Sequence, residues 1–246
     1  MNAWNNIKAI MKRELGGYFT SPIAYVFLVI FLLLTGVFTF TFGGFFDRGE
    51  ASLGSFFVWL PWLFLFLVPA VGMRMWAEER RGGTIELLLT MPVLPWHAIV
   101  GKFLASWLFL AIALAMTFPV VLTVNLLGSP DNGIIVGGYI GALLLSGAYL
   151  AVTSMTSAMT RNQVVSFIIA VVLCLGLILI GFTPVTDLLS RWMGPDLIDT
   201  VASFGVLTHY DGFQRGVLDS RGVLFFVSVI VFALFVTAVL IRRRMG

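Results

Sequence analysis

Six long apolar runs dominate the chain, and none of them contains Asp, Glu, Lys or Arg. A helix needs about 20 consecutive apolar residues to cross the hydrocarbon core of a bilayer. The runs therefore predict six transmembrane helices. They cover residues 22–42, 54–73, 103–127, 134–158, 164–182 and 222–241. We expect an all-α integral membrane protein whose residues 1–246 form a single transmembrane domain.

The composition agrees with a lipid environment. Hydrophobic residues make up 59% of the chain and charged residues 11%, with a mean hydropathy of +1.02. Soluble domains carry about 25% charged residues. The only cysteine, Cys174, lies within the fifth predicted span, so an intrachain disulfide or a thiolate metal cluster is excluded.

The basic residues predict the orientation of the six spans. Basic loops are retained in the cytoplasm, and with six spans both termini lie on the same side. Eleven of the 15 basic residues fall on that side, which places both termini in the cytoplasm; four lie on the other. A basic surface of this kind suits anionic lipid headgroups rather than nucleic acid. The eleven are Lys8, Lys12, Arg13, Arg74, Arg80, Arg81, Lys102, Arg161, Arg242, Arg243 and Arg244.

Residues 1–20 precede the first span and carry an amphipathic pattern. Apolar residues recur at helical spacing between positions 3 and 15, beside three cations. This pattern predicts a basic helix in the membrane interface, either as a functional element or as a plain topogenic anchor. The residues that define it are Trp4, Lys8, Lys12 and Arg13.

Residues 74–100, between the second and third spans, contain a short predicted helix. Gly82 and Gly83 break the chain, Thr84 can cap the following turn, and Pro92 ends it. Glu86 would lie near the positive end of that helix. Its apolar face, formed by Ile85, Leu88 and Leu89, would be buried against a partner, against lipid or against the protein's own underside.

The sequence around this helix resembles a known signature. Residues 78–92 read Glu-Glu-Arg-Arg-Gly-Gly-Thr-Ile-Glu-Leu-Leu-Leu-Thr-Met-Pro, and Trp96 and Gly101-Lys102 follow. The segment is similar to the cytoplasmic signature of ATP-binding cassette type 2 (ABC-2) permeases. The six spans and the basic first helix match that family as well.

The resemblance implies a permease subunit of a bacterial inner-membrane exporter. In that family a dimer, of identical or related chains, forms the translocation path, and two separate ATPase subunits drive it. ATP and Mg would then bind to the partner, with no cofactor or metal in this chain. The chain also lacks a G-x-x-x-x-G-K-[ST] phosphate loop. The coupling residues implied are Glu78, Glu79, Gly83, Thr84, Ile85, Glu86, Leu88, Leu89 and Pro92.

A second segment carries a narrower resemblance. Residues 209–219, His-Tyr-Asp-Gly-Phe-Gln-Arg-Gly-Val-Leu-Asp, are similar to permeases called GldF, which are associated with gliding motility. That likeness implies a periplasmic auxiliary partner. It also suggests short re-entrant or surface helices in the outer segment 183–221, where Trp192 fits an interfacial aromatic belt equally well.

Small and polar residues mark one face of the fourth span. Glycines repeat every four residues at 133, 137 and 141, and hydroxyl side chains follow. Such faces allow close helix packing within a chain, and they could instead line a path or a dimer contact. The residues considered for the second use are Gly137, Gly141, Ser146, Thr153 and Ser157.

Titratable residues do not converge into a catalytic site. His97 and His209 fall on opposite sides of the predicted membrane, and no H-E-x-x-H motif occurs. We interpret the run His209-Tyr210-Asp211 as structural, because sequence neighbours rarely form a dyad. Two alternatives to an exporter subunit remain at this stage. One is an ion-coupled secondary transporter, although the spans lack the charge that such proteins usually carry; the other is a scaffold that transmits ATP-driven motion to a periplasmic partner.

Overall fold

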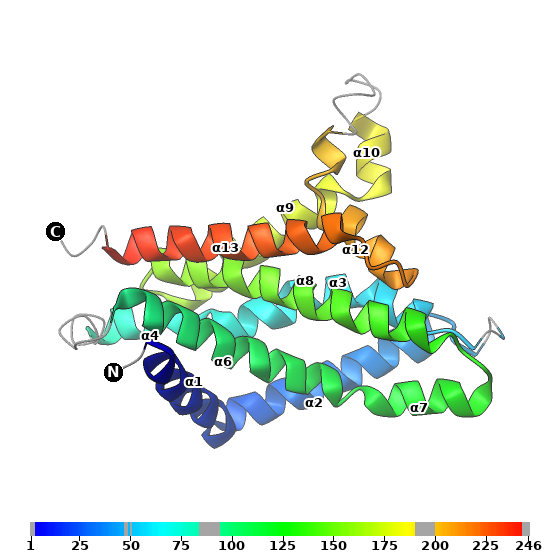
Figure 1. Cartoon of the computed structure of the whole chain (residues 1–246), viewed down its shortest axis with the longest axis horizontal. Coiled ribbons are helices and arrows are strands. Elements are labelled where there is room, and N and C mark those ends of the chain that lie inside the picture. Colours follow the sequence, from blue (N-terminus) through cyan, green and yellow to red (C-terminus); the bar gives the residue numbers. More distant parts are fainter. Residues whose placement is uncertain (1–2, 47–48, 50, 84–93, 190–199, 243–246) are drawn as a thin grey trace.

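The computed structural model describes residues 3–46, 49, 51–83, 94–189 and 200–242, and these residues form helices and no strands (Figure 1). Six helical segments are long and apolar enough to span a membrane, which confirms the predicted spans. They are Pro22–Phe42, Gly54–Gly82, Pro95–Leu127, Asn132–Met159, Gln163–Ile180 and Ser220–Arg242.

Local sequence explains where the spans begin. Pro22 opens α2 (Pro22–Val37) and Pro95 opens α6 (Pro95–Ala115), positions where the missing backbone N–H costs nothing. Asp131 accepts hydrogen bonds from the first amides of α8 (Asn132–Met159), and Asn162 does the same for α9 (Gln163–Ile180). These four spans thus begin with a proline or a side-chain cap.

Helix α8 lies at the centre of the bundle. It packs against α3 (Gly54–Gly72), α4 (Arg74–Gly82), α6, α9, α12 (Val206–Gln214) and α13 (Ser220–Arg242). Its small residues allow these close approaches: a Cβ at Gly138 would lie 2.5 Å from the Phe57 ring of α3. Helix α8 is therefore the common support for elements from both halves of the chain.

One end of the bundle collects most of the described cations. Helix α4, the start of α6 and the end of α13 lie together there, next to α1 (Ala3–Thr20), and we call this the basic end (Figure 1). The second span continues through α4 to Gly82, and the third helix begins at Pro95. Residues 74–82 and 95–100 of the expected 74–100 loop are therefore helical.

Within its described residues, the segment 183–221, predicted to lie on the outer face, contains α10 (Thr183–Leu189) and α12 before the start of α13. Helix α10 follows the fifth span, and α12 returns onto α3 and α8, where Tyr210 is buried and donates a hydrogen bond to the Phe57 carbonyl at 3.3 Å. Trp192 lies outside the described residues. The remaining elements are the π-helix η1 (Phe38–Phe42), which ends the first span, and α7 (Phe118–Leu127), which ends the third.

The end of α9 and the start of α12 meet at two glycines. A Cβ at Gly205 would lie 2.4 Å from the Gly181 Cα and 2.5 Å from its nitrogen, so backbone would have to move. We expect Gly205→Ala to destabilise the protein by about 1–3 kcal/mol, as overpacking does. The measurement is thermal unfolding in detergent.

A matched control exists in α9. A Cβ at Gly176 meets nothing within 4 Å, so Gly176→Ala should keep or raise the stability, since alanine is the better helix former by about 1 kcal/mol. Equal melting temperatures for Gly205→Ala and the unaltered chain would contradict this account of the glycine contact.

Candidate functional site

Helix α4 is fixed to α8 by a cluster of buried hydrogen bonds. The Trp76 side chain is fully buried, and its indole Nε1 donates to Ser154 Oγ at 3.0 Å. The backbone amides of Trp76 and Ala77 both donate to Ser157 Oγ at 3.0 Å, and that hydroxyl donates to the Met73 carbonyl at 2.8 Å. One serine thus satisfies amides that begin α4, which would otherwise be left without partners.

Two further contacts link the second half of α4 to its neighbours. The Arg80 guanidinium donates to the Ala158 carbonyl near the end of α8. On the other side, Glu79 Oε1 lies 2.8 Å from Lys102 Nζ, so α4 is joined to α6 as well. The helix that leads into the predicted coupling segment is therefore held on two sides.

Lys102 connects three helices at the basic end. Its side chain is only 6% exposed, and its ammonium lies 2.8 Å from Glu79 of α4 and 3.3 Å from Glu14 of α1. It also lies 5.4 Å from the centre of the Trp76 ring, within range of a cation–π interaction. A lysine this deep needs opposite charges near it, and the two carboxylates supply them.

The electrostatics of α1 follow from this cluster. Burial alone would raise the pKa of Glu14, but the charges of Lys102 and Arg13 outweigh it and hold that pKa below its ordinary value. Burial raises the pKa of Tyr18 to about 12. The Tyr18 hydroxyl bonds to Ser106 Oγ at 2.8 Å, and Ser106 in turn donates to the Lys102 carbonyl at 3.0 Å.

The basic first helix lies against α6 along one side. A Cβ at Gly101 would come within 2.8 Å of Ile10, so a glycine permits this contact. The opposite side carries the predicted interfacial residues: Trp4 is 57% exposed with Lys8 5.2 Å above its ring, and Lys12 and Arg13 are exposed. Their role at a membrane surface stays a prediction.

The predicted coupling residues divide into two groups. Glu78 and Glu79 lie on α4, and Gly83 ends that helix in the left-handed conformation with φ of 67°, which favours glycine. The other residues lie outside the described part of the chain. They are Thr84, Ile85, Glu86, Leu88, Leu89 and Pro92.

The five residues considered for a path or dimer contact lie inside the subunit. A Cβ at Gly137 would meet the Phe213 carbonyl and Gly216 of the same chain, and one at Gly141 would lie 2.5 Å from Phe213 Cβ. The side chains of Ser146, Thr153 and Ser157 are fully buried, and Thr153 contacts Gly72 of α3. These contacts pack the chain against itself, whereas a role in a path or a dimer stays a prediction.

The two histidines lie on different helices, His97 on α6 and His209 on α12. The His209 ring stacks on Phe225 at 4.1 Å between centres and contacts the Ser203 carbonyl, while Asp211 pairs with Arg215 at 2.6 Å. Tyr210 turns inward to the core instead. These contacts are structural, and the described residues hold no group of three His, Cys, Asp or Glu side chains that could bind a metal.

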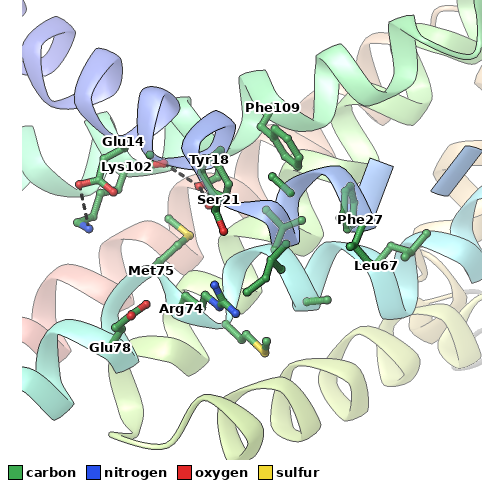
Figure 2. A pocket seen from close by; sticks show the side chains of 18 of the residues that line it. Glu14, Tyr18, Ser21, Phe27, Leu67, Arg74, Met75, Glu78, Lys102 and Phe109 are labelled. Carbon is green, nitrogen blue, oxygen red and sulfur yellow. Dashed lines mark hydrogen bonds and ion pairs between the residues drawn. The ribbon is translucent and has the colours of Figure 1, made fainter. Parts of the chain in front are cut away.

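Lys102, Glu14 and Glu79 form what we call the three-helix cluster. A cavity with a volume of about 510 Å³ opens beside it (Figure 2). Its walls come from α1, α2, α3, α4 and α6. Charged and hydroxyl groups line the part nearest the basic end, and apolar side chains of α2 and α3 line the remainder. The cavity is amphipathic along its length.

Sequence analysis did not single out the central part of this site. Lys102 was named as one of the basic residues and as part of the Gly101-Lys102 pair in the permease signature, but without a partner, and Glu14 and Trp76 received no role. A signal was present, because Lys102 follows Trp96 and Gly101 at the edge of an apolar run, where a charge calls for a partner. The partners could not be chosen without the fold.

This architecture defines an all-α, multi-pass membrane protein. The profile of the family described as ABC-2 family transporter protein matches residues 8–192, about three quarters of the chain. The chain therefore belongs to the ABC-2 transporter family and is a membrane permease of an ABC transporter, a transport component whose family implies an ABC ATPase partner. A comparison with curated proteins finds no significant match.

Proposed function

We propose that this chain is the membrane subunit of an ATP-driven exporter and works as a dimer with two ATPase subunits at the basic end. The protein would lie in the bacterial inner membrane. Its basic end and both termini would face the cytoplasm. The excess of basic residues on this side supports the orientation. Within the family, the run from His209 to Asp219 supports a GldF-type permease with a periplasmic auxiliary partner.

One observation carries the coupling mechanism. The segment 84–92 follows α4 directly, and α4 is bonded to α8 through Trp76 and to α6 through Glu79. A displacement of Gly83 would therefore move α4, and the buried contacts of α4 would transmit that movement to α8, the central helix of the bundle. ATP and Mg would act in the partner, and this chain would receive the motion.

The apolar face of the coupling segment supplies the proposed contact with the ATPase. Leu88 and Leu89 would insert into a groove on that subunit, as amphipathic helices do with their partners. Leu88→Asp combined with Leu89→Asp should reduce the ATPase recovered with the purified permease by at least about tenfold, because two carboxylates would be desolvated at the contact. The experiment co-expresses the chain with its genomic neighbours and quantifies bound ATPase by mass spectrometry.

A matched pair of leucines serves as the control. Leu126 and Leu127 end α7 at the opposite end of the bundle and are 87% and 60% exposed, so changing both to Asp should leave the bound ATPase unchanged. An undiminished amount of bound ATPase in the Leu88 and Leu89 variant would contradict the docking role. Purification of the unaltered chain without any ATPase would count against the exporter assignment itself.

A further inference from the structure

The amphipathic cavity at the basic end is lined by charged side chains, and two of them have no ion-pair partner among the described residues. Lys102, Glu14 and Glu79 are paired with one another. Arg74 and Glu78 line the same cavity from successive turns of α4, and neither makes an ion pair or a hydrogen bond within the described part of the chain (Figure 2). Among the described residues, one cation and one carboxylate therefore face the cavity without an ion-pair or hydrogen-bond partner.

We propose that this cavity binds a zwitterionic phospholipid with an amine in its headgroup, taken from the leaflet at the basic end. The Arg74 guanidinium is suited to the phosphate, which it can bind through two parallel hydrogen bonds. The Glu78 carboxylate is suited to the ammonium of the same headgroup. The inference concerns binding, and it stands whether or not the chain couples to an ATPase.

The depth of the cavity fits a lipid. Ser21 separates α1 from α2 at the point where the chain turns from the predicted interface into the first span, and Ser21 lines the cavity. Headgroups lie at this level of a bilayer. Below it the wall is apolar and suits an acyl chain, with contributions from Ala24, Phe27, Ile30, Leu67, Val71 and Phe109.

The cavity is open on the side of α2. Ile23, Val26 and Ile30 line it and are 52%, 56% and 44% exposed, so a lipid could enter laterally from the bilayer. The volume of about 510 Å³ lies within the range of pockets that hold small ligands and is large enough for a headgroup and part of a chain.

Charge balance selects the headgroup. The lining carries two cations, Arg74 and Lys102, and three carboxylates, Glu14, Glu78 and Glu79. An anionic headgroup would form an ion pair with Arg74. Its remaining negative charge would lie near the Glu78 carboxylate, and like charges brought together are unfavourable. A zwitterion satisfies both residues, so phosphatidylethanolamine should bind better than phosphatidylglycerol with the same acyl chains.

Native mass spectrometry of the full chain in detergent, titrated with these two lipids, tests the proposal. The unaltered chain should prefer phosphatidylethanolamine, and Arg74→Gln should weaken its binding by about tenfold. Glu78→Gln should instead abolish the preference by strengthening phosphatidylglycerol binding, a gain that misfolding does not produce. Arg81→Gln is the control, because Arg81 is exposed on the same helix but does not line the cavity.

Two results would overturn the proposal. One is equal binding of both lipids by the unaltered chain and by the Arg74 and Glu78 variants. The other is occupation of the open side by a second copy of the chain. The test for a second copy is Ile23→Cys in a Cys174→Ala background, which removes the only native cysteine. An efficient disulfide between copies in native membranes would show that a second copy covers this face. With a lipid at this face the cysteine stays uncrosslinked.

Discussion

Lys102→Met should lower the melting temperature of the detergent-solubilised protein by about 4–8 °C. The change removes the ammonium that neutralises Glu14 and Glu79, and the loss of one partner from a buried ion pair destabilises by about 3–5 kcal/mol. Both carboxylates retain some contact with solvent, 25% and 21% of their side-chain surface, so we expect about 2 kcal/mol here, at about 2–4 °C for each kcal/mol.

Two further variants isolate the charge effect. Adding Glu14→Gln and Glu79→Gln to Lys102→Met should recover most of the lost stability, because a buried ionic group can be replaced when all its charges are removed together. Lys12→Met changes an exposed lysine on the same helix as Glu14 and should have no effect. A Lys102→Met protein that melts with the unaltered chain would show that the three-helix cluster contributes nothing to stability.

Trp76→Ala is expected to have the larger effect of the two. The side chain is fully buried between α4 and α8, and truncation of such a tryptophan costs about 3–5 kcal/mol through lost contacts and the cavity left behind. Trp76→Phe keeps an aromatic ring but loses the hydrogen bond to Ser154, so a smaller loss of about 1–2 kcal/mol should follow. Thermal unfolding followed by size-exclusion chromatography measures both.

The same variants report on the proposed coupling. If α4 transmits motion to α8, Trp76→Phe should retain bound ATPase but transport less per ATP hydrolysed, since the docking residues are untouched. Trp4→Ala, which alters a 57% exposed tryptophan of α1, is the control for stability. Equal stability of Trp76→Ala and Trp4→Ala would contradict the assigned role of the buried ring.

The sequence was sufficient to predict the spans because their signal is local. The first run was expected at residues 22–42 and the structure has Pro22–Phe42, since a proline and the length of the apolar run define both ends. The helical extension through Arg74–Gly82 was not predicted. Its sequence is charged, and it is helical because α8 supplies Ser154 and Ser157 as partners.

The site shows the same division. Gly83 could be recognised as a helix terminator from its residue type alone, and its φ of 67° agrees. The ion pair between Lys102 and Glu14 could not be predicted from the sequence. It joins residues far apart in the chain, and their contact depends on how α1 packs on α6. Small residues at 137 and 141 indicated close packing, but their partner, Phe213, lies on a helix beyond the fifth span.

The bonding of α4 to α8 has a consequence for biogenesis. Trp76 and Ser154 are 78 residues apart, and the whole of α6 and α7 lies between them. During synthesis the second span would leave the ribosome long before its serine partners exist, so the amides of Trp76 and Ala77 must be satisfied by water until the fourth span inserts. The position of α4 at the end of the bundle allows this, because hydration there does not require water in the hydrocarbon core. Completion of the fourth span, rather than of the second, is therefore the step at which the basic end of the permease acquires its final structure.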